Sequence, residues 1–182
     1  MYFSQDPDDA TLVARSLAGD TAAFEAIVVK YERVLFRVAL RMLGNTEDAR
    51  DATQTAFVSA YGKLASFDAN FRFFSWLYRI LLNECLNTRR DRRPHEPVMP
   101  EMALAASPLD ALEASERRHR VQLALLALPH DYREVIVLRH FAEMGYDEIA
   151  STLGIAPKTV KSRLHTARQR LTELLILEKT GT

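Results

Sequence analysis

Residues 145–171 read GYDEIASTLGIAPKTVKSRLHTARQRL, and this stretch decides the fold of the C-terminal part of the chain. Its apolar residues recur at helical spacing on either side of Gly154. Gly154 suits the left-handed position that ends a first helix. Pro157 suits the first turn of a second helix, where its missing N–H costs nothing. The stretch therefore predicts a helix-turn-helix, whose second helix enters the major groove of DNA.

The outer face of that second helix is basic. Residues 156–170 contain five Lys or Arg residues and no Asp or Glu. The alternative interpretation is an ordinary solvated helix, but such helices usually carry charges of both signs. The glycine, the proline and the single sign of charge together favour contact with duplex DNA.

The composition predicts an all-α chain, and the length allows one or two small domains. It has 182 residues, of which 48% are hydrophobic and 26% charged, with six Gly, seven Pro and few alternating β-branched runs. The lone Cys85 excludes an internal disulfide and is expected to be a packed thiol. No His pairs with Cys or His at metal-ligand spacing, so no metal or cofactor is expected. The acidic N-terminus is unlike a signal peptide and no apolar run is long enough for a membrane span, so we expect a cytoplasmic protein.

A proline-rich segment divides the chain. Pro94, Pro97 and Pro100 forbid a helix there and predict a linker over residues 94–107. Before it, helices are expected at residues 9–18, 21–43, 45–65 and 72–91, in a first domain of residues 1–93. After it, helices at residues 108–128 and 130–141 join the helix-turn-helix in a second domain of residues 108–182. The net charge is zero, but two basic stretches are separated by an acidic one.

The middle basic stretch, residues 71–93, interleaves aromatic residues with arginines as FRFFSWLYRILLNECLNTRRDRR. Rings that stack on bases beside cations that hold phosphates are typical of single-strand binding. The alternative is that most of these rings belong to the core, since their spacing is helical. The preceding loop, residues 67–71, is a better place for a base pocket because an unpaired base needs a concave site.

Five motifs in this order resemble the extracytoplasmic-function (ECF) type of bacterial sigma-70 family factor. They read GDTAAFEAIV, EDARDATQTAF, FSWLYRILLN, LLALPHDYREVIVLRHF and YDEIASTLGIAPKTVKSRLHTARQRL. The resemblance implies a protein that is not an enzyme, that binds core RNA polymerase and promoter DNA, and that helps melt the minus-ten element. The linker would thread toward the polymerase active-site channel. The alternative function is a stand-alone helix-turn-helix regulator that binds DNA without polymerase.

The same resemblance assigns candidate site residues. Those for polymerase docking are Asp48, Asp51, Gln54 and Phe57. Those for the minus-ten element are Phe67, Asn70, Arg72, Arg79, Asn83, Asn87 and Arg90. Those for the minus-thirty-five element are Lys161, Ser162, His165 and Thr166, with Lys158, Arg163 and Arg168 as phosphate contacts.

Two departures from the family pattern bear on regulation and specificity. Arg50 and Thr55 stand where the family commonly has Glu or Asp, which weakens an acidic docking surface. We hypothesise that a Ser/Thr kinase restores the charge at Thr55, with Thr53 as the second candidate, and that no anti-sigma factor is then required. The alternative is a plain exposed threonine, and an anti-sigma factor stays a candidate partner. Thr166 replaces a common Arg, so the usual minus-thirty-five preference is not expected.

Overall fold

The computed structural model describes the backbone of residues 7–91 and 108–180 and the side chains of residues 9–90 and 115–176. The described residues form helices and no β-strand, which confirms the all-α prediction. The helices are α1 (Pro7–Leu17), α2 (Thr21–Leu43), α3 (Thr46–Lys63), a 3₁₀ turn (Leu64–Ser66), α4 (Phe73–Asp91), α5 (Pro108–Ala127), α6 (His130–His140), α7 (Tyr146–Leu153) and α8 (Pro157–Thr180). The predicted helices lie within a few residues of these bounds, although α8 runs on past the predicted motif. The predicted linker falls outside the described residues.

The helix ends form as their sequence signals predict. Gly44 ends α2 at φ 79° and Gly154 ends α7 at φ 67°, the left-handed conformation that favours glycine. Asn45 then begins α3, because its side chain accepts a hydrogen bond from the amide of Glu47 at 2.9 Å. A Cβ atom added at Gly44 would lie 2.5 Å from Cδ1 of Leu126, so this glycine also lets α2 and α5 approach.

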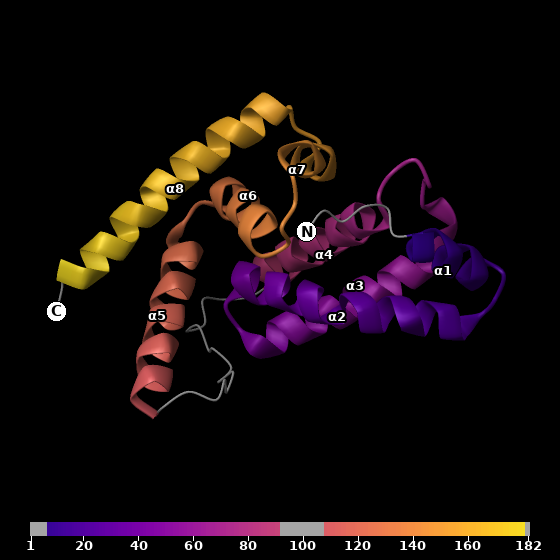
Figure 1. Cartoon of the computed structure of the whole chain (residues 1–182), viewed down its shortest axis with the longest axis horizontal. Helices are drawn as coiled ribbons and strands as arrows, with labels where there is room; N and C mark the ends of the chain where they lie inside the picture. The colour runs from indigo at the N-terminus through magenta and orange to yellow at the C-terminus, as the bar shows by residue number, and fades with distance from the viewer. Residues whose placement is uncertain (1–6, 92–107, 181–182) are drawn as a thin grey trace.

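The helices form two groups that lie against each other (Figure 1). In the first group α2 packs on α1, α3 and α4, and in the second the long α8 packs on α5, α6 and α7. Between the groups, α2 contacts α5 and α6, and α4 contacts α7. The buried apolar side chains of both groups belong to one continuous cluster. The contact between the groups is therefore part of the packed interior.

Buried polar side chains join the two groups through helix-end carbonyls. The guanidinium of Arg133 on α6 donates to the carbonyl of Leu125 in α5 and to that of Met42 in α2, both at 2.8 Å. The amide of Gln122 on α5 donates to the carbonyl of Leu40 in α2 at 3.1 Å. These bonds add side-chain donors at the C-terminal ends of both helices, where the carbonyl of Leu40 also accepts from the amide of Gly44 and that of Leu125 from the amide of Leu128.

Candidate nucleic-acid interface and docking groove

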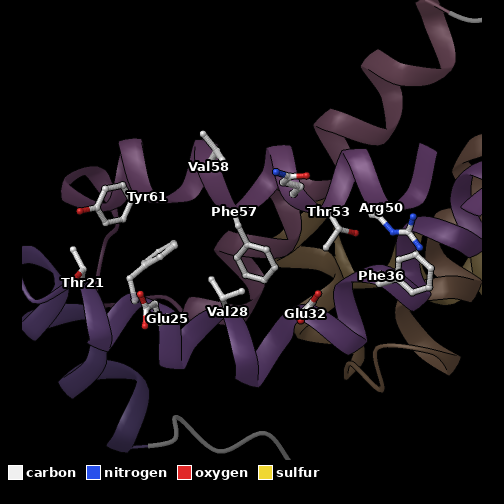
Figure 2. Close-up of a pocket in the computed structure, with 12 residues that line it drawn as sticks. Thr21, Glu25, Val28, Glu32, Phe36, Arg50, Thr53, Phe57, Val58 and Tyr61 are labelled. Atoms are coloured by element: carbon white, nitrogen blue, oxygen red, sulfur yellow. The ribbon is translucent and has the colours of Figure 1, made fainter. Parts of the chain in front are cut away.

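An apolar groove runs between α2 and α3 (Figure 2). Its volume is about 840 Å³. Phe57 projects from α3 toward Val28 of α2, and Val58 and Tyr61 stand exposed along its rim. The full lining comprises Thr21, Phe24, Glu25, Val28, Glu32, Phe36, Arg50, Thr53, Gln54, Phe57, Val58 and Tyr61. A surface of this shape and polarity can accept the apolar face of a partner helix.

The four docking residues predicted on α3 have different exposures. Asp51 and Gln54 are exposed, and Gln54 and Phe57 line the groove. Asp48 is only 7% exposed and lies in the first turn of α3. The sequence prediction missed the α2 wall of the groove because it treated that helix's apolar residues as core. The sequence of α2 does indicate this wall, because the helix has more apolar residues than a single buried face can hold.

The two threonines proposed for phosphorylation have different surroundings. Thr53 is 5% exposed and its hydroxyl donates to the carbonyl of Ala49 at 2.6 Å. Thr55 is exposed, one helical turn after Asp51. Of the two, Thr55 is therefore the one that a kinase could reach in this fold.

Two of the predicted minus-ten residues contact the helix-turn-helix. Arg72 forms an ion pair with Glu148 of α7. Arg79 donates from Nη2 to the carbonyl of Ser151 at 2.6 Å and from Nε to that of Thr152 at 3.0 Å. These carbonyls lie at the C-terminal end of α7, so Arg79 of α4 supplies hydrogen-bond donors to the end of a helix in the helix-turn-helix. In this arrangement both guanidinium groups bind protein.

The other minus-ten candidates divide between a cluster and an open face. The ring of Phe67 lies 5.3 Å from that of Phe73 and 5.4 Å from that of Trp76, centroid to centroid. The amide of Asn70 donates to Asp68, which shapes the loop. Three candidates are exposed along α4, namely Asn83, Asn87 and Arg90. The ring of Phe67 thus helps build the aromatic core beneath the loop.

The recognition face of α8 is open to solvent. Val160, Leu164 and Ala167 are buried on the inner side of this helix, as the sequence predicts. The outer side carries the exposed Lys158, Lys161, Ser162, His165 and Arg168, with Thr166 half-buried. This arrangement leaves five of the seven predicted minus-thirty-five residues accessible to DNA.

The seventh, Arg163, lies in a different environment. Its guanidinium donates to Asp131 at 2.7 Å and to Glu134 at 3.1 Å, both on α6. Within the described part of the chain, His130, Asp131 and Glu134 form the one group whose three potential metal ligands come within 4.8 Å of one another. Arg163 binds both carboxylates, so a side chain of the protein itself occupies the place that a metal ion would take.

The buried ionisable groups near this contact have shifted pKa values. The pKa of Glu134 is raised to about 7, mainly by burial and also by the nearby Asp131, while Arg163 opposes the rise. Burial lowers the pKa of His130, whose Nδ1 lies 3.4 Å from the Glu134 carboxylate. Cys85 is 2% exposed, which confirms that its thiol is packed, and burial raises the pKa of this thiol to about 12. No helix in the described residues is long and apolar enough to cross a membrane.

Comparisons with known proteins agree on one family. Residues 27–95 match the model of Sigma-70 region 2, and residues 118–171 match that of Sigma-70, region 4. The chain is 36% identical over 170 residues to the ECF RNA polymerase sigma factor SigW of Bacillus subtilis, covering 86% of this chain and 91% of SigW.

Two solved structures are also similar. CnrH in complex with the cytosolic domain of CnrY has a TM-score of 0.76 at 30% identity, covering 93% of this chain and 98% of that one. RpoE in complex with the anti-sigma factor NepR from Bartonella quintana has a TM-score of 0.71 at 27% identity, covering 87% and 98%. The chain therefore belongs to the ECF family of RNA polymerase sigma factors.

Proposed function

We propose that this chain is a non-enzymatic transcription initiation factor that works in the cytoplasm, docks on core RNA polymerase and directs it to promoters. The single observation that carries the proposal is that one chain holds both an apolar groove between α2 and α3 and an open basic face on α8. A stand-alone regulator needs the second feature but has no use for the first. The proposed domains are residues 1–93 and 108–182, joined by residues 94–107.

We assign polymerase docking to the groove and its rim. Asp51 and Gln54 are exposed beside an apolar floor that includes Phe57. A partner helix that buries apolar residues against Phe57 and meets Asp51 with a cation would satisfy both parts of this surface. Glu25 and Glu32 on the α2 wall add negative charge to the side opposite Asp51. The α2 wall and Asp51 therefore favour a helix that is apolar on one face and basic at its flanks, whereas Arg50 on the α3 wall opposes such a partner.

Promoter reading divides between α4 and α8. We assign base-edge contacts to Lys161, Ser162 and His165 on α8, and phosphate contacts to Lys158 and Arg168, because these side chains are exposed on its outer face. On α4, Asn83, Asn87 and Arg90 are exposed, and the guanidinium of Arg90 donates to the side-chain oxygen of Asn87. Arg72 and Arg79 become available only when their bonds to α7 break. Minus-ten reading through these arginines thus requires that α7 move away from α4.

Regulation is assigned to the docking helix. Phosphorylation of the exposed Thr55 would add about −1.5 to −2 charge units one turn from Asp51. The CnrH and RpoE structures both contain a second protein, and the RpoE partner is an anti-sigma factor. An anti-sigma factor is therefore a second candidate regulator of this chain, and it would act by contact rather than by modification.

Polymerase docking can be tested with two exposed valines. Val58 lies on the groove rim, whereas Val29 is 78% exposed on α2 and is not part of the lining. Val58→Asp should weaken binding to core polymerase by about tenfold or more, because it places a charge where apolar surface is buried. Val29→Asp should bind like the unaltered chain. Equal binding of both variants, or equal loss, would remove the groove from the docking assignment.

A further inference from the structure

The inner flank of the recognition helix carries a cation that faces protein. The side chain of Arg163 is 24% exposed, between the exposed Lys161 and Ser162 on one side and the buried Leu164 on the other. Its two terminal nitrogens point to two different carboxylates of α6, Nη2 to Asp131 and Nη1 to Glu134. A guanidinium that is held at both terminal nitrogens is fixed in orientation as well as in position.

The carboxylates that bind Arg163 are themselves fixed. Asp131 and Glu134 lie in the first turns of α6, where the positive end of the helix dipole favours negative charge. Glu134 is largely buried, and its second oxygen faces Nδ1 of His130 at 3.4 Å. Asp131 is exposed and closes the contact from the solvent side. The contact therefore ties a rigid part of α6 to the second turn of α8.

The remaining cations on this stretch of α8 differ from Arg163. Lys158, Lys161 and Arg168 are exposed on the outer face, where phosphate groups could reach them. To reach a phosphate, Arg163 would have to give up two charge-assisted hydrogen bonds and leave Glu134 buried without its cation. Without Arg163 the buried Glu134 would either remain as an unpaired charge or take up a proton, and both outcomes cost free energy, so exchange of this partner for a phosphate is unfavourable.

We propose that Arg163 is a positioning residue, which sets the rotation and tilt of the recognition helix by bridging it to Asp131 and Glu134. The proposal rests on the assignment of the α8 outer face to promoter DNA. Rotation of a helix about its axis displaces every side chain on its outer face, so loss of the bridge misplaces Lys161, Ser162 and His165 together. Arg163 thereby acts on promoter affinity through the contacts of its neighbours and makes none of its own.

Salt dependence separates a positioning residue from a phosphate contact. Holoenzyme reconstituted with core polymerase is used to recover a promoter fragment from a random library, and its affinity is measured across a range of salt concentrations. Log affinity falls as log salt concentration rises, and each lost phosphate contact makes this slope shallower by about 0.9. The variants are Arg163→Gln and, as the matched control, Arg168→Gln on the same helix.

We expect Arg163→Gln to weaken binding about tenfold at every salt concentration and to leave the slope unchanged. Arg168→Gln should make the slope shallower by about 0.9. A shallower slope for Arg163→Gln, or unchanged affinity, would overturn the proposal. If the unaltered holoenzyme recovers no promoter, the DNA-reading assignment itself fails, and that result is distinct from either outcome for Arg163.

A second variant keeps the test decisive if Arg163→Gln does not fold. Asp131→Asn combined with Glu134→Gln leaves Arg163 in place and removes both of its anionic partners. Under the proposal this double variant binds promoter more weakly, because α8 loses its bridge. If Arg163 is a phosphate contact, the same variant binds more tightly, because the guanidinium is released and two repulsive charges are removed. The opposite signs decide between the two roles.

Discussion

Arg72 of α4 forms an ion pair with Glu148 of α7, although 76 positions separate them in the sequence. Glu148 has a second task, since its other carboxylate oxygen accepts a hydrogen bond from the amide of Gly145 at 2.9 Å and so caps α7. One carboxylate thus begins the first helix of the helix-turn-helix and holds it against a predicted minus-ten residue. The charge and the capping oxygen can be separated by substitution.

Glu148→Gln should loosen the contact between α7 and α4 while keeping the helix cap. Glutamine retains an oxygen for the amide of Gly145 but loses the charge that attracts Arg72. The pair is partly exposed, so its loss should cost about 0.5–1 kcal/mol and speed amide hydrogen exchange at this contact by about two- to fivefold. The control is Asp147→Asn, which removes an exposed neighbouring charge. Equal acceleration in both variants would contradict the prediction.

Gly44→Ala should destabilise the chain more than Gly19→Ala. Both glycines have positive φ, so both substitutions strain the backbone, by roughly 1 kcal/mol. Only at Gly44 does the new Cβ atom meet a neighbour, Cδ1 of Leu126 at 2.5 Å, whereas nothing lies within 4 Å at Gly19. We expect an additional loss of about 1–2 kcal/mol at Gly44, measured by urea unfolding. Equal losses would mean that Leu126 moves aside without cost.

Glu134→Gln should flatten the pH dependence of stability. The pKa of Glu134 is raised to about 7 in the folded chain, mainly by burial, whereas the unfolded chain loses this proton near the ordinary pKa of 4.5. The folded chain therefore binds more protons between these values, and stability is greatest below the unfolded pKa and falls as pH rises through about 7. As the pH rises, the free energy of unfolding should fall further in the unaltered chain than in the variant, by a difference on the order of 2 kcal/mol.

The measurement is urea unfolding of both proteins at pH 5 and at pH 7.5. Burial lowers the pKa of His130, and this group acts with the opposite sign, since its contribution to stability is lost as pH falls. His130 is present in both proteins, but its Nδ1 lies 3.4 Å from Glu134, so their difference reports Glu134 together with the change that the substitution makes in the pKa of His130. An identical pH dependence in the two proteins would mean that the Glu134 carboxyl titrates alike in the folded and unfolded chain.

Thr55→Glu should be more active than Thr55→Ala in a promoter reporter. A carboxylate at this exposed position supplies part of the charge that phosphorylation would add beside Asp51. Treatment of the unaltered chain with a Ser/Thr kinase should raise transcription by reconstituted holoenzyme, and Thr55→Ala should not respond. Equal activity of the Glu and Ala variants would remove phosphorylation at Thr55 from the account.

Thr166→Arg should create a preference for guanine at one minus-thirty-five position. Arginine can donate to guanine O6 and N7 together, which is worth about 1–3 kcal/mol of discrimination, and threonine cannot. Gln169→Arg is the control, because it adds the same charge at an exposed position of the same helix. It should strengthen binding to all sequences alike. Promoter selection from a random library measures both, and recovery of the common family motif by the unaltered chain would show that Thr166 does not set specificity.

Local signals in the sequence were sufficient to predict the helices. Gly44, Gly154 and Pro157 act through their own backbone preferences, so their positions predict where helices end and begin. The apolar spacing in α8 likewise predicts its buried face, including Val160 and Leu164. These inferences need only a few neighbouring residues, which is why they are confirmed.

Contacts between distant residues could not be predicted in this way. The sequence predicts DNA contacts for Arg72, Arg79 and Arg163, because it does not show which protein group a basic residue on a polar helix face will bind. Their partners lie on α6 and α7, at separations that a helical pattern does not register. The α2 wall of the groove was missed for a related reason, since apolar spacing does not show whether an apolar side chain is covered.

The four carbonyl acceptors of Arg133 set how the two helix groups can separate. Three of them, on Leu125, Leu126 and Leu128, belong to α5 and its end, and one, on Met42, belongs to α2. Of the carbonyls that Arg133 binds, separation would return only that of Met42 to water, where a new donor is at once available, while the carbonyl of Leu40 would lose its bond from Gln122. The guanidinium would stay bonded within its own group, so the α5–α6 corner would survive undocking with its geometry intact. Arg133 thus stabilises the contact between the two helix groups, and it keeps three of its four hydrogen bonds when the groups separate.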